Sequence, residues 1–167
     1  MLTVNDIEMA VAEHFGIRTH IIVPNVSWGL GVHECDLLSV TKAGYATEIE
    51  IKVSRQDIKA DLKKRHTHKS SKIKYLYFAI PDVLRDSIEF IPDKAGIFII
   101  SKDNYGDIIC IEERKPVACE FARKLTDKEI LKVATLGTMR IWNMKKVINT
   151  QNKEIMRIRD GQMVRTI

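Results

Sequence analysis

Two alternating segments joined by a short glycine turn constrain the fold more than any other feature of this sequence. Residues 33–40 (HECDLLSV) and 45–53 (YATEIEIKV) alternate apolar and polar side chains, which is the period of a β-strand. Three-residue hairpin loops commonly use a type I turn followed by a left-handed residue, and Lys42, Ala43 and Gly44 fit that geometry. The two segments are therefore predicted to form a β-hairpin.

The turn also fixes which residues of the two strands face each other. The predicted facing pairs are Leu38 with Glu48, Asp36 with Glu50, and Glu34 with Lys52. The opposite face is the expected core side and collects Cys35, Leu37, Ile49, Ile51 and Val53. Two acids directly opposite each other repel, so the pairing of Asp36 with Glu50 weakens a simple hairpin. A divalent cation between the two carboxylates would remove that repulsion.

The remaining pattern alternates between helices and strands. A first helix is predicted from a cap at Thr3 or Asn5 to Phe15, and a second helix starts directly after Ser54. Further strands are predicted at 19–24 and 73–81, with a second hairpin formed by 95–101 and 107–113. A C-terminal helix covers 126–150 with Ile130, Val133, Ile141 and Met144 buried, and the tail 151–167 is either a strand or a loose extension. This order predicts a single α/β domain over residues 1–167, with a mixed central β-sheet flanked by helices.

The composition excludes several classes of protein and favours a cytoplasmic one. The sequence has no run of about 18 apolar residues that could span a membrane, and its first residues lack the basic start of a signal peptide. Its three cysteines form no Cys-x-x-Cys pair, so we expect reduced thiols. His66 and His68 form one close histidine pair, which is either a zinc site or, as we expect, no metal site at all.

The positive charge of the chain is concentrated behind the first hairpin. The net charge is +5, and the stretch from Arg55 to Lys74 has two arginines and six lysines against only Asp57 and Asp61. Such a block either binds the backbone of a nucleic acid or is a solvated helix face.

Asp36, Glu50 and Lys52 carry the pattern of metal-dependent phosphodiester cleavage. Two carboxylates and a backbone carbonyl, that of Ile51, can hold Mg²⁺ or Mn²⁺ through oxygen ligands. The ion acidifies a water molecule and neutralises charge on the phosphate, while a lysine on the same strand face stabilises the negative charge that develops. Other acid-x-lysine tripeptides occur at Asp57 and Asp61, but they lie on a predicted helix, where positions i and i+2 do not share a face.

Neighbouring residues are assigned accessory roles. Glu8 and Glu13 either add a carboxylate or are ordinary exposed helical acids, and Glu48 either ligands a second metal ion or solvates the strand end. The residues expected to contact nucleic acid are Ser54, Gln56, Lys59, Lys63, Lys64, Arg65, Lys69 and Lys72. The alternative for the lysines is that they only keep the helix surface soluble. The alternative for Gln56 is that it merely occupies the first turn of the helix and contacts no phosphate.

At these residues the sequence resembles the PD-(D/E)XK nuclease superfamily, and within it the MmcB-like DNA-repair proteins. Asp36 and Glu50-Ile51-Lys52 match the core motif, although Cys35 stands where the superfamily has a proline. The stretch EIEIKVSRQDIKADLKK and the later strands YLYFAIPDVL, IPDKAGIFIIS and YGDIICIEE resemble the MmcB-like group. The resemblance implies a restriction-endonuclease-like fold and Mg²⁺-dependent DNA cleavage, with Asp36 and Glu50 as metal ligands and Lys52 as the catalytic lysine.

Two functions follow from the sequence. The first is a metal-dependent DNA nuclease that acts in DNA repair, recombination or the processing of phage or mobile-element DNA. The second is a catalytically inactive nuclease-like module that binds nucleic acid. A homodimer would suit the cutting of both strands.

Overall fold

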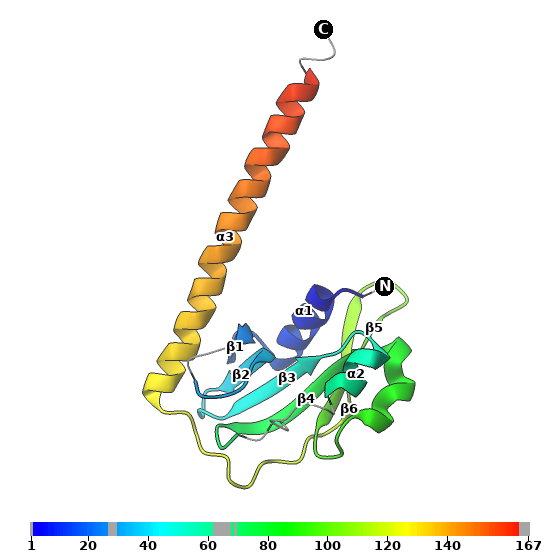
Figure 1. Cartoon of the computed structure of the whole chain (residues 1–167), viewed down its shortest axis with the longest axis vertical. Helices are drawn as coiled ribbons and strands as arrows, with labels where there is room; N and C mark the ends of the chain where they lie inside the picture. The colour runs from blue at the N-terminus through cyan, green and yellow to red at the C-terminus, as the bar shows by residue number, and fades with distance from the viewer. Residues whose placement is uncertain (1, 27–29, 62–67, 69, 164–167) are drawn as a thin grey trace.

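The computed structural model describes residues 2–26, 30–61, 68 and 70–163 and shows a six-stranded sheet with helices around it (Figure 1). The elements in chain order are α1 (Val4–Phe15), β1 (His20–Val26), β2 (Cys35–Thr41), β3 (Ala46–Ile51), α2 (Arg55–Asp61), β4 (Ile73–Pro81), the 3₁₀ segment η1 (Asp82–Phe90), β5 (Gly96–Lys102), β6 (Ile108–Arg114) and α3 (Asp127–Met163). Apart from η1, every element was predicted from the sequence.

The first hairpin has the predicted turn and register. Gly44 takes a left-handed φ of 85°, and its N–H donates to the Thr41 carbonyl at 2.9 Å. The Thr41 N–H donates to the Tyr45 carbonyl at 3.0 Å, which closes the turn. Leu38 lies opposite Glu48, as the count from the turn predicted. The same register, continued by two pairs, sets Asp36 against Glu50.

The sheet is mixed, as predicted, and its strands lie side by side in chain order from β1 to β6. β1, β2 and β3 are antiparallel, β3, β4 and β5 are parallel, and β6 is antiparallel to β5. Parallel neighbours need a crossover, which α2 supplies between β3 and β4, and η1 between β4 and β5. This is an α/β fold, and it is consistent with the expected restriction-endonuclease-like arrangement.

Helices cover both faces of the sheet, so β3 is buried along its whole length. On one face, α1 packs Ile7 and Val11 against a cluster that includes Ile49 of β3. On the other face, Ile58 of α2 packs with Phe78 of β4. Glu48 and Glu50 lie beside Leu76 and Phe78 in the parallel register, and therefore face α2. The polar residues of β3 are consequently enclosed.

The C-terminal helix departs from its prediction. α3 is one helix from Asp127 to Met163, so a strand or loose extension over 151–163 is wrong. Its first turns pack on β1 and bury Val133, but the predicted burial of Ile141 and Met144 is wrong, and Trp142 is exposed as well. The reason is geometric: beyond its first turns, α3 extends away from the sheet (Figure 1). None of the helices in the described ranges is long and apolar enough to cross a membrane.

Val53 is a smaller correction at the end of the hairpin. It was assigned to the core side but is exposed, because it lies two residues beyond the end of β3.

Candidate functional site

Glu48, Glu50 and Lys52 occupy alternate positions near the end of β3 and project from the face that α2 covers. Alternation of a strand puts residues i, i+2 and i+4 on one side. The Glu50 and Lys52 side chains are 2% and 4% exposed, and Glu48 is equally buried. The alternative that Glu48 only solvates the strand end is therefore wrong.

Asp36 reaches the same end of β3 from the neighbouring strand. Its Oδ2 atom accepts a hydrogen bond of 2.7 Å from the Ile51 N–H. This contact holds the carboxylate beside the peptide unit that links Glu50 to Ile51. The hairpin thus brings together the acid and the acid-x-lysine motif that the sequence pairs.

Lys52 is held between two carboxylates. Its Nζ atom donates to Glu50 Oε2 at 2.7 Å and lies 3.2 Å from Asp61 Oδ1. Asp61 is the last described residue of α2 and is buried, so α2 supplies the second acid that positions the ammonium group. Asp61 was assigned no role from its sequence position, because an acid on a basic helix looks like an ordinary surface residue.

Glu8 and Glu13 are separated by the structure. Burial raises the pKa of Glu8, and the negative charge of Asp36 raises it further, so α1 carries Glu8 toward the Asp36 end of the hairpin. Glu13 is exposed and borders a depression with Asp6 and Asp107 instead. Of the two acids, Glu8 is the one whose pKa responds to the charge of Asp36.

Two histidines complete a buried network around Glu48. The Glu48 Oε1 atom lies 2.6 Å from His33 Nε2 and 2.6 Å from His68 Nδ1. His68 Nε2 lies 2.7 Å from Asp61 Oδ2. A continuous chain of polar contacts therefore runs from His33 through Glu48, His68 and Asp61 to Lys52.

This network shifts the protonation of its members. Burial lowers the pKa of His68, but hydrogen bonds to Asp61 and Glu48 outweigh that effect and raise the pKa to about 9. Burial raises the pKa of Glu48, but the hydrogen bonds from His33 and His68 bring it below its usual value.

The histidine cluster was missed by sequence reasoning. His33 lies 15 residues before Glu48 and His68 lies 20 residues after it, so no spacing motif connects the three. The sequence paired His68 with His66, which lies outside the described residues.

The donor atoms fall into two chemically different sets. Asp36, Glu50 and the Ile51 carbonyl offer oxygen ligands, which suit a hard cation such as Mg²⁺. Burial and, to a smaller extent, the negative charge of Asp36 raise the pKa of Glu8, and a cation beside these acids would offset both effects. His33, Glu48 and His68 offer two imidazole nitrogens and a carboxylate, all within 4.8 Å of one another. The residues present therefore fit a metal ion at both sets of donor atoms.

Only part of the expected nucleic-acid surface can be placed. Lys63, Lys64, Arg65 and Lys69 lie outside the described residues. Ser54 Oγ accepts a hydrogen bond of 3.1 Å from the Asp57 N–H, which is the predicted helix cap. Gln56 and Lys59 are exposed on α2 and border a shallow depression.

Lys72 is less available to nucleic acid than the sequence suggested. Its Nζ atom contacts the Leu30 carbonyl and lies 3.0 Å from Glu129 Oε1 at the start of α3. These contacts give it a structural role.

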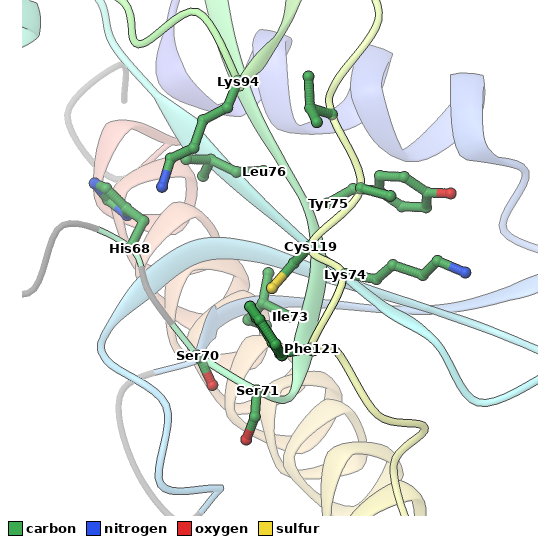
Figure 2. Close-up of a pocket in the computed structure, with 12 residues that line it drawn as sticks. His68, Ser70, Ser71, Ile73, Lys74, Tyr75, Leu76, Lys94, Cys119 and Phe121 are labelled. Carbon is green, nitrogen blue, oxygen red and sulfur yellow. The ribbon is translucent and has the colours of Figure 1, made fainter.

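A largely apolar pocket of about 470 Å³ opens beside His68 (Figure 2). The segment after β6 forms one wall: it passes β4, where the Cys119 N–H donates to the Lys74 carbonyl at 2.8 Å, and it places Phe121 beside Ile73. Among the described residues that line the pocket, none is Asp36, Glu50 or Lys52. The pocket is therefore next to the histidine cluster and apart from the proposed hydrolytic residues.

Comparison with known proteins agrees with the resemblance seen in the sequence. Residues 4–146 match the family model described as DNA repair protein MmcB-like. The fold is similar to that of the SPO1766 protein of unknown function from Silicibacter pomeroyi, with 17% sequence identity, a TM-score of 0.60, and coverage of 89% of this chain and 92% of that chain. A search of curated proteins finds no match. The family match indicates a role in DNA repair, and the chain belongs to the MmcB-like family of PD-(D/E)XK-like DNA repair proteins.

Proposed function

We propose that this protein is a metal-dependent nuclease that hydrolyses phosphodiester bonds of DNA during repair. The observation that carries the proposal is the convergence at the end of β3: the Asp36 carboxylate bonded to the Ile51 N–H, and Lys52 ion-paired with Glu50. Membership of a DNA repair family supports DNA as the substrate.

Each residue of this group has a defined part in the proposed reaction. Asp36, Glu50 and the Ile51 carbonyl would hold Mg²⁺ or Mn²⁺, and Glu8, whose pKa Asp36 helps to raise, would add an outer carboxylate. The bound ion would acidify the attacking water and neutralise charge on the scissile phosphate. Lys52 presents an ammonium group 2.7 Å from Glu50, where it can orient that water and stabilise the developing negative charge.

DNA would approach across α2. Gln56 and Lys59 are exposed there, and the basic residues that follow in the sequence, Lys63, Lys64 and Arg65, extend the same positive charge. Contacts of this kind bind the phosphate backbone without reading bases, which favours structure-selective or nonspecific cutting.

One observation favours a second candidate, a nuclease-like module that binds DNA without cutting it. Glu50 and Lys52 are almost fully buried, and Lys52 is already engaged by Glu50 and Asp61. Cleavage requires the phosphate to reach these groups, so this burial would have to open when DNA binds.

A substrate panel separates the two candidates. We expect the purified chain to cut plasmid, single-stranded or branched DNA in Mg²⁺ or Mn²⁺, and to be inactive in a chelator. A gel-shift assay in Ca²⁺ would measure binding on the same substrates. Binding without cleavage of any substrate in either ion would support the inactive module and contradict the nuclease.

A further inference from the structure

We propose that His33, Glu48 and His68 bind a divalent transition-metal ion, with Zn²⁺ as the representative ion, at a site separate from the one formed by Asp36 and Glu50. The three side chains come from three parts of the chain: the segment before β2, strand β3, and the segment between α2 and β4. The inference concerns residues that the proposed cleavage does not use as metal ligands, and it does not rest on that function.

The geometry converges on a single point. His33 Nε2 and His68 Nδ1 each lie 2.6 Å from the same carboxylate oxygen of Glu48. A tetrahedral Zn²⁺ with bonds near 2.0 Å holds its ligand atoms about 3.3 Å apart, so each contact needs to open by only about 0.7 Å. Two imidazoles and one carboxylate are a common protein ligand set for zinc, with a fourth position left for water.

The second oxygen of Glu48 points to the same conclusion. Glu48 is almost fully buried, and within the described part of the chain its Oε2 atom has no hydrogen-bond partner. A buried carboxylate oxygen without a partner is costly. A metal ion bound by Glu48 would satisfy it, either directly or through a bound water.

Asp61 supplies the outer contact that histidine ligands of metals ordinarily have. Its Oδ2 atom lies 2.7 Å from His68 Nε2, on the side of the ring away from Glu48. A carboxylate in this position fixes the ring orientation and the tautomer, and leaves Nδ1 as the ligand atom. Asp61 is therefore a positioning residue for the site, and its other oxygen contacts Lys52 at 3.2 Å.

The donor chemistry distinguishes this site from the Asp36 site. Imidazole nitrogens suit zinc and neighbouring transition ions, whereas Mg²⁺ prefers oxygen ligands and keeps several waters. Millimolar Mg²⁺ should therefore not displace an ion from the histidines.

Metal binding without DNA tests the inference. We expect the full chain, stripped by a chelator and reloaded with Zn²⁺, to retain one ion per chain by mass spectrometry of the metal, in the presence of Mg²⁺. His33→Gln and Glu48→Gln should each weaken zinc binding more than tenfold, and Asp61→Asn about 10- to 100-fold. His20→Gln is the matched control and should bind zinc like the parent, since His20 contacts Thr19 and Phe15 rather than the cluster.

The zinc measurements test this inference independently of the nuclease assay. Asp36→Asn should keep its zinc, so loss of cleavage and loss of zinc are separable. Visible absorption of the Co²⁺-loaded chain, abolished by His33→Gln in a protein with an unchanged circular dichroism spectrum, would confirm nitrogen ligation and exclude unfolding as the cause. A parent chain that retains no zinc, or variants that retain as much as the parent, would overturn the proposal and leave a hydrogen-bonded network without metal.

An independent observation on α3 carries a second inference: we propose that a second copy of this chain covers its exposed apolar stripe as a parallel two-stranded coiled coil. Beyond the turns that pack on β1, exposed apolar residues recur with heptad spacing. They are Ile141, Met144, Ile148, Ile155 and Ile158. Ile141, Ile148 and Ile155 occupy equivalent a positions, where β-branched residues favour parallel dimers.

The length of the stripe agrees with this partner, and its distal end carries one attractive charge pair. The apolar stripe, the seam of the proposed coiled coil, is about 26 Å long from Ile141 to Ile158 and extends away from the sheet (Figure 1). In a parallel dimer Glu154 at position g faces Arg159 at position e of the other helix, an attractive pair, while Arg140 at g faces Lys145 at e, a repulsive pair nearer the sheet.

Sedimentation of adjacent variants tests the dimer. We expect the parent to be dimeric, and Ile155→Lys, whose parent side chain is 61% exposed, to weaken the dimer at least tenfold. Met156→Lys is the matched control, because Met156 is 66% exposed but lies off the seam. A parent that stays monomeric at high micromolar concentration, or two variants that dissociate equally, would contradict the coiled coil and leave the stripe to another partner.

Discussion

Replacing Lys52 by methionine should lower the rate of DNA cleavage by at least about a hundredfold, which is the usual effect of removing one group that stabilises transition-state charge. Methionine keeps much of the volume of the buried lysine stem but removes the ammonium group that lies 2.7 Å from Glu50 and 3.2 Å from Asp61. Single-turnover cleavage at saturating enzyme measures the effect on chemistry. Affinity for DNA in Ca²⁺ should change little.

The same substitution leaves Glu50 and Asp61 buried without their cation, which costs about 3–5 kcal/mol of stability. Asp36→Asn therefore serves as a second variant, because asparagine can still accept the hydrogen bond from the Ile51 N–H while losing the charge that a metal ion needs. Lys128→Met, at an exposed position of α3, is the matched control and should cleave like the parent. If folded Lys52→Met and Asp36→Asn cut as fast as this control, these residues are not catalytic.

Phe98→Ala should lower the free energy of unfolding by about 3–5 kcal/mol, as expected when a fully buried aromatic side chain is removed. Phe98 is 1% exposed and stacks on Tyr77 with ring centroids 4.3 Å apart. Its ring also meets the edges of His14 and Phe15, at the end of α1. The cavity would therefore loosen the helix that carries Glu8, and denaturant titration measures the loss.

Phe121→Ala is the matched control for that change. Phe121 is 85% exposed, so the same substitution should alter stability by no more than about 0.5 kcal/mol. If Phe98→Ala lowers the free energy of unfolding no more than Phe121→Ala does, the aromatic cluster does not hold α1 on the sheet.

The sequence determined the hairpin because the residues that specify it are close together along the chain. The turn at Gly44 and the alternation of the two strands fix one register, and a slip of one residue would turn every side chain to the wrong face. The placement of Asp36 beside the peptide between Glu50 and Ile51 follows from that register alone. The caps at Thr3 and Ser54 are equally local, and both are present.

α3 shows where local information ends. The sequence pattern correctly predicted a helix here. Whether one face of a helix is buried depends on the elements packed against it, and the sheet ends before Ile141. Apolar residues at helical spacing therefore predicted a core that the described part of the chain does not supply.

The sequence by itself determined the hairpin, its register and the pairing of an acid with an acid-x-lysine motif, since each depends on residues a few positions apart. Only the tertiary structure decided that Glu48, Glu50 and Lys52 are buried, because that depends on α2 folding over the end of β3. It also decided that His33, His68 and Asp61 meet Glu48 and Lys52. Such contacts arise from how strands and crossovers pack in space, and no spacing along the chain encodes them.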